Sequence, residues 1–331
     1  MTDPSPITAS QPLSSRRGTL WRRLLQIVVL VAVVCFLGRS IVGQWGAIRA
    51  HPWHLNAYWL IGSAAMIWCD FVILIALWRY LLAGIAGRAL PWRSAYRVWF
   101  LSNMGKYLPG KIWTVMGMVY LLQGRGFAAP AVLAAAILNQ AFSILSGAIL
   151  VVIVLGSRAL NGLPVLPIAL GLAVTLVILY PPWFAWLINR GLRRFGYAPI
   201  SIPLSFGRGL LLFLAYALTW LVYGVAFWVM LQGMSVNPGP ILEVSAVFAG
   251  AYLIGFLAVF APGGLGVREG ALAVLLKPYL GTGLASLAAV ASRLWMSIVE
   301  MLGLVPLLWW REREVAPAPP APPTGASEVS P

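Results

Sequence analysis

Long apolar stretches recur along the chain, and shorter polar stretches separate them. The apolar stretches mix Leu, Ile, Val and Ala without strict alternation, and most approach the roughly 20 residues that a helix needs to cross a bilayer. This pattern is typical of membrane-spanning helices and not of the alternating strands of an outer-membrane barrel. It predicts seven spans, at residues 24–42, 56–83, 130–156, 163–189, 209–232, 240–260 and 284–310.

Composition agrees with this pattern, because 61% of the residues are hydrophobic and only 9% are charged. Such a balance is typical of a polytopic membrane protein. We therefore expect an all-α integral membrane bundle over residues 24–311. A basic cytoplasmic segment at residues 1–23 precedes it, and a Pro/Ala-rich tail at residues 312–331, with no periodic apolar pattern, is predicted to be disordered.

The formal net charge of +15 does not indicate nucleic-acid binding, because the basic residues fall between apolar runs and not on one soluble face. They gather before the first span and in alternate loops, around residues 88–125 and 190–208. The positive-inside rule therefore predicts a multi-pass protein of the inner (cytoplasmic) membrane with a cytoplasmic N-terminus. A cleaved signal peptide is the alternative for the first run, but no small-residue cleavage site closes it cleanly.

Two stretches around a Pro-Gly pair resemble each other. Residues 107–124 read YLPGKIWTVMGMVYLLQG and residues 260–277 read FAPGGLGVREGALAVLLK, and they align without a gap. About 12 residues follow each Pro-Gly pair, and as a helix they rise roughly 18 Å, less than the hydrocarbon thickness of about 30 Å. We predict two re-entrant half-helices within a bundle of seven to eight spans, while interfacial helices remain the alternative. The sequence allows the C-terminus on either side of the membrane.

The N-terminus of a half-helix inside the membrane attracts anions, and paired Gly/Pro-interrupted segments are the best sequence pointer to a transport site. Both stretches carry basic residues. The predicted substrate-binding residues are Lys106, Pro109, Gly110, Lys111, Pro262, Gly263, Gly264, Gly266, Arg268, Glu269 and Arg293.

Carboxylates within apolar segments also need an explanation, because insertion scales assign a buried charge a cost of about 2.5 to 3.5 kcal/mol. Arg293 and Glu300 share one helical stripe but lie about 10 Å apart, so each needs another partner. Glu269 for Arg293 and Arg268 for Glu300 are the economical pairs. Asp70 either pairs with a cation or carries a proton. A structural ion network is the alternative to a functional role for these charges.

Three motifs carry a resemblance to a known family. SNMGKYLPGKIW, APGGLGVREGAL and ASRLWMSIVEMLGL resemble the flippase-like membrane family that includes the transmembrane region of lysylphosphatidylglycerol synthase, over roughly residues 20–311. Trp113 and Thr114 stand where family members often carry a glycine and a glutamate. Asn139, Gln140 and Ser143 replace an acidic residue, an arginine and an aspartate. The resemblance implies a lipid-handling function.

Together these observations predict transbilayer movement of an anionic phospholipid, or of a lipid-linked phosphate or sugar, for envelope synthesis. The membrane lipid is the expected partner, with envelope-synthesis enzymes as further candidates. We expect no cofactor, metal or nucleic acid, and no enzyme activity, because no lysyl-transferase domain follows the last span. A non-transporting membrane subunit of an envelope-synthesis complex is one alternative. A polyprenyl-lipid transferase is another, but it would need a metal-holding acidic cluster that the sequence lacks.

Overall fold

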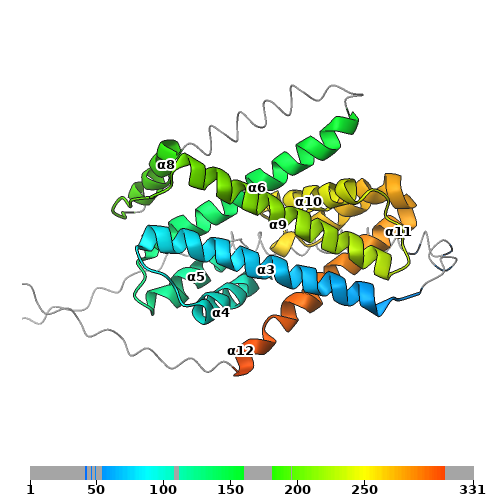
Figure 1. Cartoon of the computed structure of the whole chain (residues 1–331), viewed down its shortest axis with the longest axis horizontal. Helices are drawn as coiled ribbons and strands as arrows, with labels where there is room; N and C mark the ends of the chain where they lie inside the picture. Colours follow the sequence, from blue (N-terminus) through cyan, green and yellow to red (C-terminus); the bar gives the residue numbers. More distant parts are fainter. Residues whose placement is uncertain are drawn as a thin grey trace, which may run out of the picture.

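The computed structural model describes residues 54–107, 112–159, 181–194 and 196–309, together with positions 42, 46 and 49. Within these ranges every regular element is a helix (Figure 1), which confirms the all-α prediction. The predicted spans at residues 24–42 and 163–189 fall largely outside the described residues, except for part of the second, which forms α8 (Pro181–Arg194).

Among the described residues, four helices are long and apolar enough to cross a membrane: α3 (Ala57–Ala86), α6 (Ala129–Ala159), α9 (Phe206–Gly233) and α11 (Val267–Leu302). α3 has 30 residues, so it rises about 45 Å, more than the roughly 30 Å of hydrocarbon. These four helices agree with a multi-pass membrane protein.

Polar caps and glycine set the ends of α3. The Asn56 side chain accepts a hydrogen bond from the Tyr58 N–H at 3.0 Å, which satisfies one of the unpaired donors of the first turn. Gly87 follows the last turn with φ 69°, a left-handed conformation that glycine adopts without strain. Asn56 and Gly87 therefore set the two ends of this 30-residue helix.

α3 and α9 lie side by side and run antiparallel (Figure 1). The backbone N–H of Asn56, before α3, donates to the carbonyl of Gly233, the last residue of α9, at 2.9 Å. Further along the two helices, the Ser63 hydroxyl donates to the Ala226 carbonyl at 2.8 Å. The C-terminal end of α3 therefore lies at the same end of the molecule as the N-terminal end of α9.

A helical hairpin follows α3. It consists of α4 (Trp92–Asn103), the short helix η1 (Met104–Tyr107) and α5 (Trp113–Gln123). α4 and α5 pack against each other. With 12 and 11 residues, they rise only about 18 and 16 Å, so neither is long enough to cross a bilayer alone.

A second helical hairpin follows α9. It consists of α10 (Ile241–Leu257), the short helix η2 (Pro262–Gly264) and the first arm of α11, which pack against each other. α11 is interrupted at Gly281, whose φ of 71° and ψ of 170° are not helical. The predicted half-helix and last span are thus two arms of one element, residues 267–280 and 282–302. The predicted span at residues 240–260 is an apolar helix of 17 residues, shorter than the four long helices.

The two halves of the chain therefore repeat one order of elements: a long helix, a hairpin of short helices and another long helix. Because α3 and α9 are antiparallel, the two hairpins start from opposite ends of the molecule (Figure 1). Their turns meet, since η1 contacts η2. The aligned Pro-Gly stretches at residues 107–124 and 260–277 belong to these two turns and to the arms that follow them.

Candidate functional site

The turn of the second hairpin is built from glycines in left-handed conformations. Gly263, Gly264 and Gly266 have φ values of 56°, 67° and 84°. A Cβ atom on Gly264 would lie only 2.8 Å from the carbonyl oxygen of Gly255, on the facing helix α10. Glycine is therefore required at position 264 both for the backbone conformation and for the close approach of two backbones.

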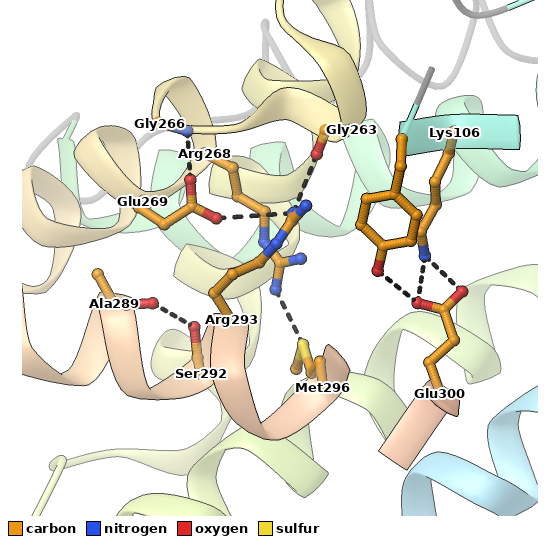
Figure 2. A network of polar contacts seen from close by, with 11 residues as sticks. Lys106, Gly263, Gly266, Arg268, Glu269, Ala289, Ser292, Arg293, Met296 and Glu300 are labelled. Atoms are coloured by element: carbon orange, nitrogen blue, oxygen red, sulfur yellow. Dashed lines mark hydrogen bonds and ion pairs between the residues drawn. The ribbon is translucent and has the colours of Figure 1, made fainter. Parts of the chain in front are cut away.

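Glu269 caps the first turn of α11. One of its carboxylate oxygens, Oε2, accepts a hydrogen bond from the Gly266 N–H at 2.5 Å (Figure 2). The other oxygen, Oε1, lies 3.6 Å from Nη1 of Arg293. Glu269 is 4% exposed, so this carboxylate links the turn of the hairpin to the second arm of α11 from inside the protein. The expected ion pair between Glu269 and Arg293 is present.

Arg293 connects the same two segments a second time. Its Nη1 donates to the carbonyl of Gly263 at 3.0 Å, so the guanidinium holds the glycine turn directly. Its other terminal nitrogen, Nη2, is buried and has no hydrogen-bond partner among the described residues. A buried guanidinium N–H without an acceptor is costly, and it offers a donor to an anion.

The first hairpin contributes a lysine to this centre. Lys106 of η1 lies 2.5 Å from Oε1 and 2.6 Å from Oε2 of Glu300, and the Tyr107 hydroxyl donates to Oε2 at 3.0 Å. Glu300 is 6% exposed and belongs to the second arm of α11. The pairing of Arg268 with Glu300 that the sequence suggested is therefore wrong, because the turn of the first hairpin supplies a closer cation.

Arg268 lies between two aromatic rings. Its guanidinium carbon is 5.0 Å from the ring centroid of Phe248 and 5.0 Å from that of Tyr252, both on α10, and its Nη2 lies 2.9 Å from the sulfur of Met296. The residue is 6% exposed. Within the described part of the chain, no carboxylate lies within ion-pair distance of it. Cation–π contacts replace a counter-ion here.

Asp70 approaches the centre from α3. It is 2% exposed, and its Oδ1 has no hydrogen-bond partner among the residues that the structure describes. Two helical turns before it on the same face of α3, Ser63 accepts a hydrogen bond from Nε1 of Trp295, so this face lies against the arm of α11 that carries Arg293 and Glu300. We count Asp70 with these charges, although none of them lies within ion-pair distance of it among the described residues.

We call this group the charged centre: Lys106, Arg268, Arg293, Asp70, Glu269 and Glu300. Figure 2 shows five of these side chains: Glu269 and Arg293 reach the glycine turn, Arg268 points to Met296, and Lys106 pairs with Glu300. Of the predicted substrate-binding residues, Pro262, Gly263, Gly264 and Gly266 form that turn, whereas Pro109, Gly110 and Lys111 lie outside the described residues.

Sequence reasoning did not identify four residues of this site. Tyr107 could have been found, because it is the aromatic residue that precedes the first Pro-Gly pair in the repeat. Phe248, Tyr252 and Met296 carry no comparable signal, since apolar and aromatic residues are common on these helices. Their proximity to Arg268 is a result of packing between α10 and α11.

The charged centre is closed in this conformation. The side chains of Arg293 and Glu269 are 14% and 5% exposed, and that of Lys106 is the most open of the paired cations at 35%. A cavity of about 550 Å³ lies elsewhere, between the end of α3 and the loop that precedes α6, where Arg88 and Phe127 line it.

The fold and the site define a class: a multi-pass helical membrane protein with a buried centre of charges where two helical hairpins meet. The comparisons with known proteins specify the family. The profile of the lysylphosphatidylglycerol synthase TM region matches residues 23–302, and the chain belongs to that family. This match confirms the resemblance that the motifs suggested. Comparisons with curated proteins and with solved structures gave no match.

Proposed function

We propose that this protein moves an anionic lipid, either a phospholipid or a lipid-linked phosphate, between the two leaflets of the inner membrane. The observation that carries the proposal is the pair of arginines at the glycine turn, of which Arg268 is buried and Arg293 is partly buried. Arg268 has no carboxylate partner among the described residues, and Nη2 of Arg293 has no hydrogen-bond acceptor. Charge-assisted hydrogen bonds from guanidinium groups to phosphate oxygens are strong and geometrically specific.

The two hairpins support this proposal. We infer that both are re-entrant, with their turns at membrane depth, because both arms of the first hairpin and the first arm of α11 are too short to cross alone, and because the two turns contact each other. Irregular backbone at that depth is tolerated only beside protein or a water-filled cavity. The positive end of the α11 dipole, at Gly266 and Val267, adds to the attraction for a phosphate.

Membrane orientation follows from the distribution of basic residues. α8 and the start of α9 carry Arg190, Arg193, Arg194 and Arg208, and the antiparallel packing of α3 and α9 places them at the same end of the molecule as Arg88. We propose that this end is cytoplasmic, since short cytoplasmic loops carry an excess of Arg and Lys.

The orientation can be tested with single cysteines in a background where Cys35 and Cys69 are replaced by alanine. Arg193→Cys, at an exposed position of α8, should resist an impermeant thiol reagent in intact cells and react after the cells are opened. Asn237→Cys, exposed at the opposite end of α9, is the matched control and should react in intact cells. Labelling with the reverse pattern would contradict the orientation.

One observation favours a second function. The charged centre is closed and internally bridged, as expected of a structural ion network in a non-transporting subunit of an envelope-synthesis complex. The two functions differ in lipid binding. If the centre holds a phosphate, phosphatidylglycerol should raise the melting temperature of the purified protein saturably, because a ligand that binds only the folded state stabilises it. Phosphatidylcholine is the control. Equal stabilisation by both lipids would favour the structural network.

A further inference from the structure

Asp70 lies on the inward face of α3. Two helical turns before it, Ser63 occupies the same face, where its hydroxyl donates to the Ala226 carbonyl of α9 and accepts a hydrogen bond from Nε1 of Trp295 of α11 at 3.0 Å. Asp70 is itself 2% exposed. The carboxyl group therefore faces the contact between α9 and α11 and not the lipid.

At this depth a carboxyl group needs either a cation or a proton, because an ionised carboxylate without a partner is costly in a low-dielectric interior. No described lysine or arginine lies within ion-pair distance of Asp70, and its Oδ1 accepts no hydrogen bond from a described residue. Glu269 and Glu300 differ from it, since each has a cation at 3.6 Å or closer. Among the three carboxylates of the charged centre, Asp70 is the one whose charge has no described counter-ion.

The other titratable groups around Asp70 leave it as the candidate proton carrier. α6, which packs on α3, has no titratable residue between positions 129 and 156. The other titratable groups of α3 and of the remaining neighbouring elements are Tyr58, Cys69, Arg79 and Tyr80 of α3, Arg93, Tyr96 and Arg97 of α4, Lys106 and Tyr107 of η1, Arg208, Tyr216 and Tyr223 of α9, Glu243 and Tyr252 of α10, and Arg268, Glu269, Lys277, Tyr279, Arg293 and Glu300 of α11. Phenol, lysine and arginine side chains ordinarily titrate well above neutral pH, and Glu243, Glu269 and Glu300 each have a hydrogen-bond or ion-pair partner.

Charge balance links Asp70 to an anionic substrate. Within the described residues, the charged centre contains three cations and three carboxylates, so its net charge is zero when Asp70 is ionised. Protonation of Asp70 leaves one net positive charge, which matches the single negative charge of a phosphodiester head group. An ionised Asp70 and a phosphate in the same dry centre would repel each other.

We propose that Asp70 is a proton-binding site that is loaded together with the anionic head group, so that one proton crosses the membrane with each lipid. This inference rests on the proposed function. On loading, an Asp70 carboxyl oxygen takes a proton from water on the entry side, and on release the proton passes to water on the exit side. No covalent bond to the lipid forms. The loaded centre carries no net charge, so a pH gradient drives the cycle and a membrane potential does not.

The test uses the full-length protein in vesicles of phosphatidylcholine with labelled phosphatidylglycerol and an entrapped pH-sensitive dye. Under a pH gradient of two units, the labelled lipid should accumulate in one leaflet, at the limit by about tenfold per pH unit, and its movement should acidify or alkalinise the lumen. A membrane potential imposed without a pH gradient should leave the distribution unchanged. Lipid exchange that ignores the pH gradient would overturn the proton site and leave the proposed function standing.

Substitutions at position 70 test whether Asp70 is responsible for the response to the pH gradient and for the proton flux. Asp70→Asn should abolish both the response to the pH gradient and the lipid-dependent proton flux, and Asp70→Glu, which keeps a carboxyl group, should retain them. Glu243→Gln is the matched control, because Glu243 accepts a hydrogen bond from Tyr279 on the α10–α11 hairpin, outside the charged centre. A pH response in Asp70→Asn equal to that of the wild type would overturn the assignment.

If Asp70→Asn does not fold, a measurement on the wild-type protein tests the same proposal. Wild-type protein in weakly buffered detergent should take up about one proton for each phosphatidylglycerol bound, since binding and protonation are linked. Binding without proton uptake would overturn the proposal. A wild type that neither binds nor exchanges the anionic lipid would overturn the proposed function together with it.

Discussion

Arg268→Ala should lower leaflet exchange of an anionic lipid on the order of a hundredfold while the protein remains folded. The loss corresponds to about 3 kcal/mol, within the range observed when one partner of a buried charge-assisted contact is removed. Folding should survive, because Arg268 has no ion-pair partner among the described residues and its cation–π contacts with Phe248 and Tyr252 are modest contributions. Exchange is measured in vesicles and folding by thermal denaturation of the same preparation.

A matched control separates the loss of the charge at the centre from the loss of any arginine over an aromatic ring. The guanidinium carbon of Arg190 lies 5.5 Å from the ring centroid of Trp186 on α8, away from the charged centre. Arg190→Ala should leave exchange within about twofold of the wild type, in line with the small effects typical of surface substitutions. Arg268→Lys should be intermediate, because it keeps the charge and loses the planar donor fork. Normal exchange in folded Arg268→Ala would show that the arginine is structural.

Gly264→Ala should be the most destabilising single substitution in the glycine turn. The new Cβ would lie 2.8 to 3.1 Å from three backbone atoms of Gly255, and φ at this position is 67°. A non-glycine residue in that conformation costs about 1 to 3 kcal/mol, and overpacking against the backbone adds a similar amount. We expect a loss of roughly 2 to 6 kcal/mol, measured as a large drop in melting temperature together with a loss of lipid exchange.

Gly270→Ala provides the control in the same half-helix. Apart from the adjacent residues and the backbone of its own helix, no described atom lies within 4 Å of the Cβ that this substitution would add. Because alanine is favoured over glycine inside a helix by about 0.5 to 1 kcal/mol, the variant should be as stable as the wild type or slightly more stable. Equal melting temperatures for Gly264→Ala and Gly270→Ala would mean that the turn is not packed as tightly as the structure shows.

The sequence predicted the long helices well, because their signal is local. Apolar length alone identified α3, α6 and α9 to within a few residues at each end. It did not reveal that residues 267–280 and 282–302 form one interrupted element, since a single left-handed glycine at position 281 looks the same in sequence as a loop glycine. It placed an apolar helix at residues 240–260, where α10 lies, but not the packing of α10 against the first arm of α11.

The sequence predicted which residues form the charged centre, but only some of the ion pairs between them. Glu269 and Arg293 were matched correctly, because Glu300 is two turns from Arg293 on the same helix and too distant for a direct pair, which left Glu269 as the next carboxylate toward the N-terminus. Glu300 was assigned the wrong cation, since its partner Lys106 is 194 residues away in sequence and reaches it only when the two hairpin turns meet. The isolation of Arg268 and Asp70 from counter-ions could not be predicted, because it depends on how α3, α9, α10 and α11 pack together.

Leaflet exchange by the wild-type protein is the most direct test of the central claim, that the meeting point of the two hairpins carries an anionic lipid across the membrane. Purified protein is reconstituted into phosphatidylcholine vesicles with labelled phosphatidylglycerol or labelled phosphatidylcholine, and the label in the outer leaflet is quenched with an impermeant reductant. We predict that the protein exposes the inner-leaflet phosphatidylglycerol label at least tenfold faster than in protein-free vesicles, with a much smaller effect on phosphatidylcholine. Equal exchange of both lipids, or exchange no faster than in protein-free vesicles, would contradict the account.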